Sequence, residues 1–389
     1  MKVATRCSEL VMILIIERTM KVFLGATGFL FLLSLSDVAY AASAGSSLPT
    51  AKEEASARGY ALITNHDDIV AKAKAEKRLR VLAGMEPATI KATTAGFIKK
   101  YPFIDLMVQE FLGTDAAQRN FLEIKSGGKD WDIHRLFGEY YTEYSPYLAK
   151  LDILEMAERK VLQIPPPMID PNQRNTLAFF SRFHVTAYNK KLLGANPAPR
   201  SWEDLLKPEW KGRKFTLDIT PTGVASLVPA WGLEKTLEFA RKLATQQPVW
   251  VRGGIRALSL VQAGEVPLTL GVNFSQLSRV QIKDSSRTLQ YVILQPVPVR
   301  LSGLQGIQAT SQSQNAALLW LEWMASLEAQ KMADDHEPLG SSVFVRGGAI
   351  EQHLRGKQVS VVSWDHQQRI AEWEAKVVEA YGFPKAESK

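Results

Sequence analysis

Short blocks of apolar and polar residues along this 389-residue chain predict helices and strands in alternation. Residues 67–76 have a helix-forming composition with acidic residues at the start, and residues 79–83 follow as an apolar run that predicts a buried strand ending at Gly84. A helix, a strand, a helix and a short strand are then predicted over residues 86–100, 104–108, 114–124 and 131–136. Because strands separated by helices imply a parallel sheet with right-handed crossovers, this part of the chain predicts an α/β lobe.

A long strand-like segment over residues 175–189 is predicted to pass between two lobes. A second α/β series follows, with strands at 214–217, 249–251 and 266–272 and helices within 223–245 and at 255–263. The chain then returns through 289–295 and 306–310 into an amphipathic helix over 315–334, whose apolar positions are Leu318, Leu319, Leu321, Trp323 and Met324. We therefore expect lobe 1 to hold residues 45–180 and 305–389 and lobe 2 to hold residues 181–304.

The first 44 residues have the pattern of a leader with a signal peptide. A basic start at Met20-Lys21 precedes an apolar run over residues 22–35, and small residues at Ala-x-Ala spacing follow it. The run is shorter than the roughly 20 residues that a membrane span needs. We expect Met20 to be the true start, cleavage to occur after Ala41 or Ala44, and the product to be periplasmic.

Composition narrows the possible functions. Hydrophobic residues make up 46% of the chain and charged residues 22%, as in ordinary globular proteins. The formal net charge is +7, but basic and acidic residues are interleaved, so nucleic acid is not an expected partner. This basic balance fits an anionic ligand as well as a merely solvated exterior. The single cysteine, Cys7, lies in the leader, so the mature chain has no disulfide, lipid anchor or cysteine-based metal site.

The usual enzyme signatures are missing from the sequence. The six histidines form no His-x-x-x-His pair, and there is no Gly-x-Ser-x-Gly, Gly-x-Gly-x-x-Gly or Walker motif. We therefore expect neither catalysis nor a cofactor. Two other classes stay open, a two-lobed ligand sensor for a membrane receptor and an exported hydrolase with an unrecognised site.

Three consecutive segments carry a family resemblance: Ala-Tyr-Asn-Lys-Lys-Leu at 187–192, Pro-Arg-Ser-Trp-Glu-Asp-Leu-Leu at 199–206 and Pro-Glu-Trp-Lys-Gly at 208–212. In this order they resemble the extracellular solute-binding proteins of ABC importers, and more narrowly the ferric-iron-binding-protein-like branch. The resemblance implies the two-lobed type II periplasmic-binding-protein fold, in which each lobe is a mixed, mainly parallel sheet flanked by helices and the lobes are joined by crossing strands. It also implies a monomer that closes on a small molecule or ion and delivers it to an ABC importer permease. The segment from Ser201 to Pro208 itself is expected to be scaffold, with Ser201 as a helix cap.

Ligands in open α/β sheets bind beyond the carboxyl ends of the strands, and this rule selects the candidate ligand contacts. In order along the chain, they are Glu86, Trp131, Asp132, Thr220, Thr222, Gly223, Arg252, Asn273 and Phe274. Thr222 either helps to hold an anion or caps a helix, and Arg252 either clamps a carboxylate or phosphate or is solvated. Arg182 and His184 lie on the predicted crossing segment, where a packed role for His184 is expected.

The family resemblance also implies adjacent tyrosines near residues 273–275, because phenolate oxygens suit ferric iron. This chain has Phe274 there instead. Tyr140, Tyr141 and Tyr144 fall in a predicted helix, where they are expected to pack or to form hydrogen bonds. A small organic anion, a metal ion and a metal chelate therefore all remain candidate ligands, and the metal ligands, if any, are unknown.

Overall fold

The computed structural model describes residues 50–111, 114–193 and 197–382, and the predicted leader lies outside these ranges. None of the described helices is long and apolar enough to cross a membrane. The strands are β1 (Arg78–Ala83), β2 (Asp105–Glu110), β3 (Ile133–Arg135), β4 (Thr176–Asn189), β5 (Phe215–Asp218), β6 (Val249–Val251), β7 (Leu268–Asn273), β8 (Leu289–Val292), β9 (Val297–Ile307) and β10 (Val359–Val362).

Helices separate most of these strands along the chain, as the sequence predicts. They are α1 (Ala51–Ala57), α2 (His66–Glu76), α3 (Pro87–Lys100), α4 (Thr114–Lys125), α5 (Tyr141–Tyr144), α6 (Ile153–Glu158), α7 (Lys190–Leu193), α8 (Thr222–Ala225), α9 (Val228–Trp231), α10 (Leu233–Thr245), α11 (Gly254–Ala263), α12 (Phe274–Lys283), α13 (Gln314–Ala325), α14 (Leu327–His336), α15 (Ala349–Leu354) and α16 (Ile370–Ala380). Short 3₁₀ turns lie at Gly138–Tyr140, Ser145–Tyr147, Pro166–Met168, Glu203–Leu206, Pro208–Trp210 and Trp364–His366.

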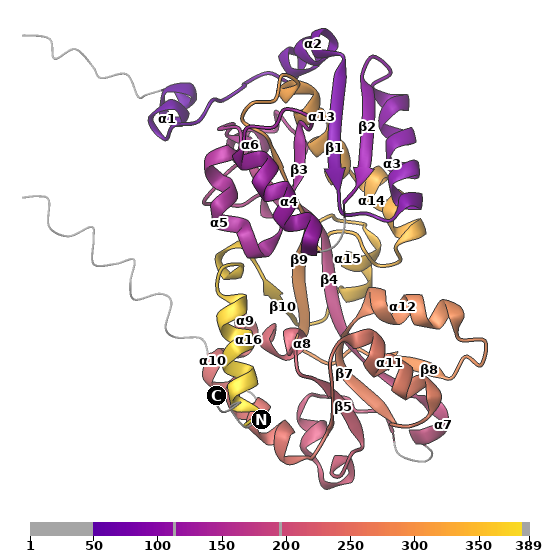
Figure 1. The fold of residues 1–389 in the computed structure, drawn as a ribbon. Helices are drawn as coiled ribbons and strands as arrows, with labels where there is room; N and C mark the ends of the chain where they lie inside the picture. Colours follow the sequence, from indigo (N-terminus) through magenta and orange to yellow (C-terminus); the bar gives the residue numbers. More distant parts are fainter. Residues whose placement is uncertain (1–49, 112–113, 194–196, 383–389) are drawn as a thin grey trace, which may run out of the picture. The chain divides into compact units, whose positions relative to one another are not determined.

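The strands form two mixed sheets that share β4 (Figure 1). In lobe 1 the order is β2-β1-β3-β9-β4, with β1 parallel to β2 and β3 and with β9 antiparallel to β3 and β4. In lobe 2 the order is β4-β7-β5-β6, with β5 parallel to its two neighbours and β8 antiparallel to β4. The predicted α/β class with mixed sheets is confirmed.

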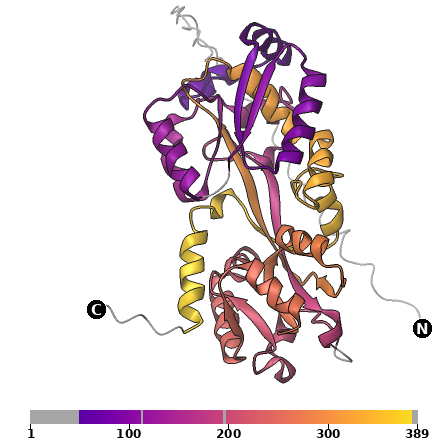
Figure 2. The ribbon, with the colours of Figure 1, turned by 45° about the vertical axis from the view of Figure 1, so that its right-hand side comes forward.

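Strand β4 connects the two sheets. Its first half, to Phe183, pairs with β9, and its second half, from His184, pairs with β7 and β8. Almost every residue of β4 is buried, as expected for a strand covered on both faces. Figures 1 and 2 both show β4 and β9 running together from one sheet toward the other. The predicted crossing segment is therefore confirmed.

Strand β9 is the main element that the sequence pattern does not reveal. Residues 289–295 and 306–310 were expected to form the return path, whereas the structure has an 11-residue strand between them, Val297–Ile307. Pro298 and Gly303, which depress strand propensity, lie inside it. The strand forms nonetheless because it has partners on both sides, with β4 along most of its length, β10 beside its first residues and β3 beside its last three.

The predicted amphipathic helix over 315–334 needs two corrections. It is interrupted at Ser326, whose side chain accepts a hydrogen bond from the Ala329 amide at 3.2 Å and caps α14. Helix α13 is not amphipathic, because all residues from Ala316 to Ala325 are buried in the core of lobe 1. The indole of Trp323 donates to the Thr93 carbonyl at 3.0 Å, which satisfies its only polar atom in that core.

The last helix packs on lobe 2. Helix α16 contacts α10 and α8, and Trp373 and Val377 belong to the apolar core of lobe 2 (Figures 1 and 2). Residues 305–389 were expected to belong entirely to lobe 1, and α16 differs from that assignment. The cause is visible in its sequence, since the apolar residues of α16 need an apolar partner and those of α10 provide one.

The segment from Ser201 to Pro208 has the scaffold role expected of it, although its helix is a 3₁₀ turn. Ser201 Oγ accepts from the Asp204 amide at 3.2 Å, and Trp202 and Leu205 are buried. The Trp202 indole donates to the Pro296 carbonyl at 3.1 Å and so ties this turn to the start of β9.

Candidate functional site

A cavity of about 770 Å³ is lined by residues of both lobes. This size is within the range of about 300–1,000 Å³ usual for small-molecule sites. Lobe 1 contributes the segment that leaves β3, and lobe 2 contributes the start of α8 and the end of β7. The side chains discussed below are Arg135, Leu136, Phe137, Tyr141, Arg182, His184, Thr222, Asn273, Arg300, Leu304 and Glu374. We refer to this cavity as the cleft.

Two arginines of the cleft lie directly opposite each other on the crossing strands. Arg182 of β4 and Arg300 of β9 are partners in the antiparallel register. Like charges in this position destabilise a strand pair, so the arrangement costs stability. Each guanidinium has a carboxylate nearby, Glu337 at 3.6 Å from Arg182 and Glu374 at 3.4 Å from Arg300. Both distances exceed the 2.7–2.9 Å or so of a strong charge-assisted hydrogen bond.

Arg135 brings a third positive charge into the cleft from the end of β3. Its guanidinium lies over the Phe137 ring at 4.3 Å and donates to the Phe111 carbonyl. Gly84, at the turn after β1, makes room for it, since a Cβ at this glycine would lie 2.6 Å from Arg135 Nε. Gly84 of the predicted turn thus leaves the space that the Arg135 side chain occupies.

His184 and Asn273 pair with each other across β4 and β7 and both line the cleft. Burial, helped by the nearby Arg300 charge, lowers the pKa of His184 to about 4, so this imidazole is neutral at pH 7. Its Nδ1 has no hydrogen-bond partner among the described residues. Asn273 caps α12, its Oδ1 accepting from the Ser275 amide at 2.9 Å. Since Oδ1 has this role, the Asn273 amide nitrogen is the group available to a ligand.

Tyr141 contributes a phenol, and its surroundings keep it protonated. It is buried and donates to Asp170. Burial, followed by the Asp170 charge, raises the pKa of Tyr141 well above its usual range. The expectation that this tyrosine packs and forms a hydrogen bond is confirmed. Within the described ranges, no group of three or more His, Cys, Asp or Glu side chains is placed to hold a metal ion.

Of the nine candidate residues, Thr222 and Asn273 line the cleft. Thr222 is the first residue of α8 and does not cap it, because Pro221 occupies the capping position. Glu86 does not line the cleft and instead pairs with Arg279 of α12, which joins the lobes. Its backbone amide also donates to Glu337, the partner of Arg182, at 3.0 Å.

Trp131 and Asp132 lie at the wrong end of their strand. They precede β3, whereas the cleft lies beyond its carboxyl end at Arg135. Asp132 is buried, and its two carboxylate oxygens accept from the Arg80 amide at 2.9 Å and from Ser311 Oγ at 2.7 Å. Its role in the structure is to hold β1 beside β3.

The other four candidates do not line the cleft either. Phe274 belongs to the core of lobe 2 and stacks on Phe183 with ring centroids 4.9 Å apart. Gly223 packs on β7, because a Cβ there would lie 2.6 Å from the Gly271 carbonyl oxygen. Thr220 and Arg252 are exposed.

The sequence patterns also missed several residues of the cleft. Arg300 lies on the unpredicted strand β9, Glu374 lies on the helix assigned to the other lobe, and Arg135 follows the apolar residues of its strand. Arg135 could have been predicted, because it lies at the carboxyl end of its strand, where ligands bind in open α/β sheets.

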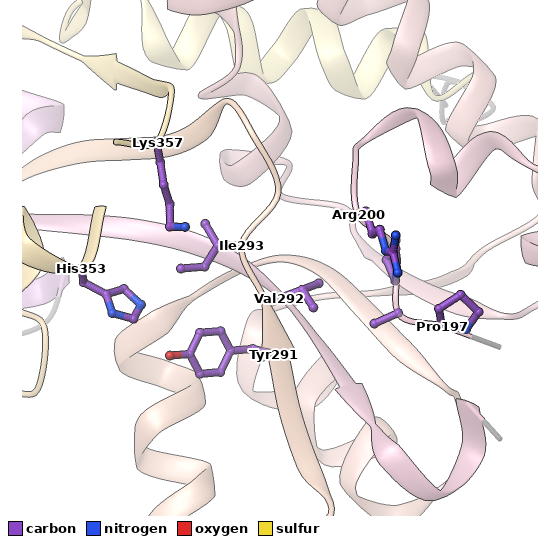
Figure 3. A pocket seen from close by; sticks show the side chains of 9 residues that line it. Pro197, Arg200, Tyr291, Val292, Ile293, His353 and Lys357 are labelled. Atoms are coloured by element: carbon purple, nitrogen blue, oxygen red, sulfur yellow. The ribbon is translucent and has the colours of Figure 1, made fainter. Parts of the chain in front are cut away.

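A second hollow of about 720 Å³ lies at the surface beside β8 (Figure 3). Tyr291 and His353 lie next to each other at one end of it, with ring centroids 6.4 Å apart, and Arg200 lies at the other end. None of its described lining residues also lines the cleft.

Two mixed sheets that share a crossing strand, with a polar cleft between them, define a two-lobed type II periplasmic binding protein. Residues 147–366 match the family described as "Bacterial extracellular solute-binding protein", and the chain belongs to this family. A "Fe(3+)-binding periplasmic protein" of Serratia marcescens is 24% identical over 207 residues, which are 50% of this chain and 60% of that relative.

Solved structures confirm the fold. Iron-bound HitA from Pseudomonas aeruginosa superposes with a TM-score of 0.58 at 19% identity, covering 78% of this chain and 99% of HitA. Ferric iron-binding protein A of Mannheimia haemolytica, in an open conformation, gives a TM-score of 0.62 at 17% identity, covering 79% of this chain and 99% of the other.

Proposed function

We propose that this protein is an exported binding protein that captures a small ligand in the cleft and delivers it to an ABC importer without transforming it. The observation that carries the proposal is that residues of both lobes line one cavity crossed by β4 and β9. A ligand bound there contacts both lobes at once and therefore stabilises the conformation in which they are together.

The crossing strands provide the hinge in this proposal. Strand β4 changes partners between Phe183 and His184, from β9 to β7, so a small change there turns one sheet relative to the other. The ion pair between Glu86 and Arg279 also links the lobes. Both side chains are at least one-third exposed, so this link is weak and does not lock the lobes together.

The predicted leader accounts for export in this proposal. Removal of residues 1–41 or 1–44 by signal peptidase would release a monomeric binding protein into the periplasm, where an importer permease receives the ligand. The relatives named above are binding proteins, which supports a role without catalysis.

The proposal is tested by recovering the ligand from protein purified in native form from the periplasm. Mass spectrometry and metal analysis after denaturation are expected to show one small molecule or ion at a nearly equimolar amount. Deleting the gene is expected to abolish uptake of that compound by cells. Normal uptake in the deletion strain, or conversion of the compound on incubation with the protein, would contradict the proposal.

A further inference from the structure

We infer that the cleft binds a small organic anion, whose phosphate or carboxylate oxygens are held by Arg135, Arg182 and Arg300. This inference rests on the proposed function, because it names the ligand class of the same site. It separates this chain from relatives described as ferric-binding, and three features of the cleft carry it.

The first feature is the charge of the lining. Three arginines reach the cleft from β3, β4 and β9, and Glu374 is the only acidic side chain among the described residues that line it. His184 adds no charge at neutral pH, because burial lowers its pKa to about 4. Arg300 has Glu374 nearby and Arg182 has Glu337, so the three arginines still leave an excess of positive charge, which attracts an anion and repels a free metal cation.

The second feature is the opposed pair of arginines on the crossing strands. Arg182 makes no side-chain hydrogen bond within the described ranges, and its one ion pair, with Glu337, spans 3.6 Å. A guanidinium presents a planar fork of N–H donors that fits the oxygens of a carboxylate or phosphate. An oxyanion placed between Arg182 and Arg300 would relieve the repulsion that their register imposes.

The third feature is the set of neutral groups around the charges. The apolar side chains of Leu136, Phe137 and Leu304 also line the cleft and suit a carbon skeleton. A bare ferric ion needs several anionic oxygen ligands and would fill little of about 770 Å³. The phenol of Tyr141, which donates to Asp170, stays protonated and is a poor ligand for such an ion.

The test is calorimetric titration of the ligand-free protein with citrate, inorganic phosphate, glycerol and ferric nitrilotriacetate. We expect citrate or phosphate to bind at least 100-fold more tightly than glycerol, and the two arms distinguish carboxylate from phosphate recognition. Failure of both anions to exceed glycerol, or transfer of iron to the protein without any bound anion, would overturn the inference.

Variants show whether binding occurs at the arginines. Arg182→Ala is expected to weaken binding of the better anion about 10- to 100-fold, and Arg182→Lys less, because lysine keeps the charge and loses the fork. Arg252→Ala is the matched control and should keep wild-type affinity, since Arg252 is exposed and does not line the cleft. Equal affinity in Arg182→Ala and wild type would overturn the inference. Uptake and ligand recovery are separate measurements, so the proposed function survives if only the anion assignment fails.

Discussion

The two ends of β3 carry polar residues with opposite roles. At its start, both oxygens of the Asp132 carboxylate are occupied, and the backbone of Asp132 also donates to Arg80 and accepts from Gln308 at 2.9 Å each. At its end, Arg135 enters a cleft where like charges face each other. A polar cluster that is fully satisfied within the protein stabilises the fold, whereas one with surplus charge of a single sign is suited to a ligand.

The largest effect expected from this comparison is on stability. Asp132→Ala leaves the Arg80 amide and the Ser311 hydroxyl without their buried acceptor, so we expect the free energy of unfolding to fall by about 2–4 kcal/mol. Denaturant titration measures this, and affinity for the anions should hardly change in the folded variant. Asp130→Ala, at an exposed position two residues earlier, should stay within about 0.5 kcal/mol of wild type. Wild-type stability together with reduced anion affinity in Asp132→Ala would contradict this assignment, because Asp132 would then act in ligand binding and not in stabilising the fold.

The sequence predicts the elements of this comparison better than it predicts their chemistry. Local composition is enough to place β1 and α3, where Gly84, Pro87 and Pro102 mark the boundaries, and the crossing strand β4, which is a long segment rich in aromatic and β-branched residues. Strand β9 carries Pro298 and depends on pairing with distant strands, which no local pattern contains. Because β9 was not predicted, its residue Arg300 was not recognised as a candidate ligand contact.

The site residues show the same limit. Asp132 precedes the three-residue strand β3 and Arg135 is its last residue, and only the end at which the chain leaves the strand faces the cleft. Phe274 follows β7 as a ligand contact should, but its ring turns inward and stacks on Phe183. Side-chain direction at a strand end depends on the packing of the next element, here α12, and so could not be predicted from spacing.

A smaller effect is expected when the pH is lowered. It changes the free energy of unfolding through one residue of the cleft, His184. His184 has a pKa of about 4 in the folded protein and about 6.5 when unfolded, so the unfolded chain binds more protons between these values. The contribution of neutral His184 to the free energy of unfolding is therefore full above pH 6.5 and declines as the pH falls toward 4. We expect a loss of about 2 kcal/mol between pH 7 and pH 5.

The measurement for His184 is unfolding of the wild type and of His184→Gln at several pH values. Other groups titrate in both proteins, so the difference between the two unfolding curves isolates His184. That difference should shrink as the pH falls, because the glutamine variant has no imidazole to protonate. A difference that is constant from pH 7 to pH 5 would show that the imidazole is not held neutral in the cleft.

The smallest effect concerns the space that Gly84 leaves for Arg135. An alanine Cβ would lie 2.6 Å from Arg135 Nε, and the long arginine side chain can move aside, so stability should change by no more than about 1 kcal/mol. Displacing the guanidinium should nevertheless weaken anion binding about three- to tenfold. Titration of Gly84→Ala, Arg135→Ala and the double variant distinguishes this mechanism from a general distortion. If Gly84 acts only through Arg135, the double variant binds no more weakly than Arg135→Ala alone, whereas additive losses would mean that the end of β1 contacts the ligand independently.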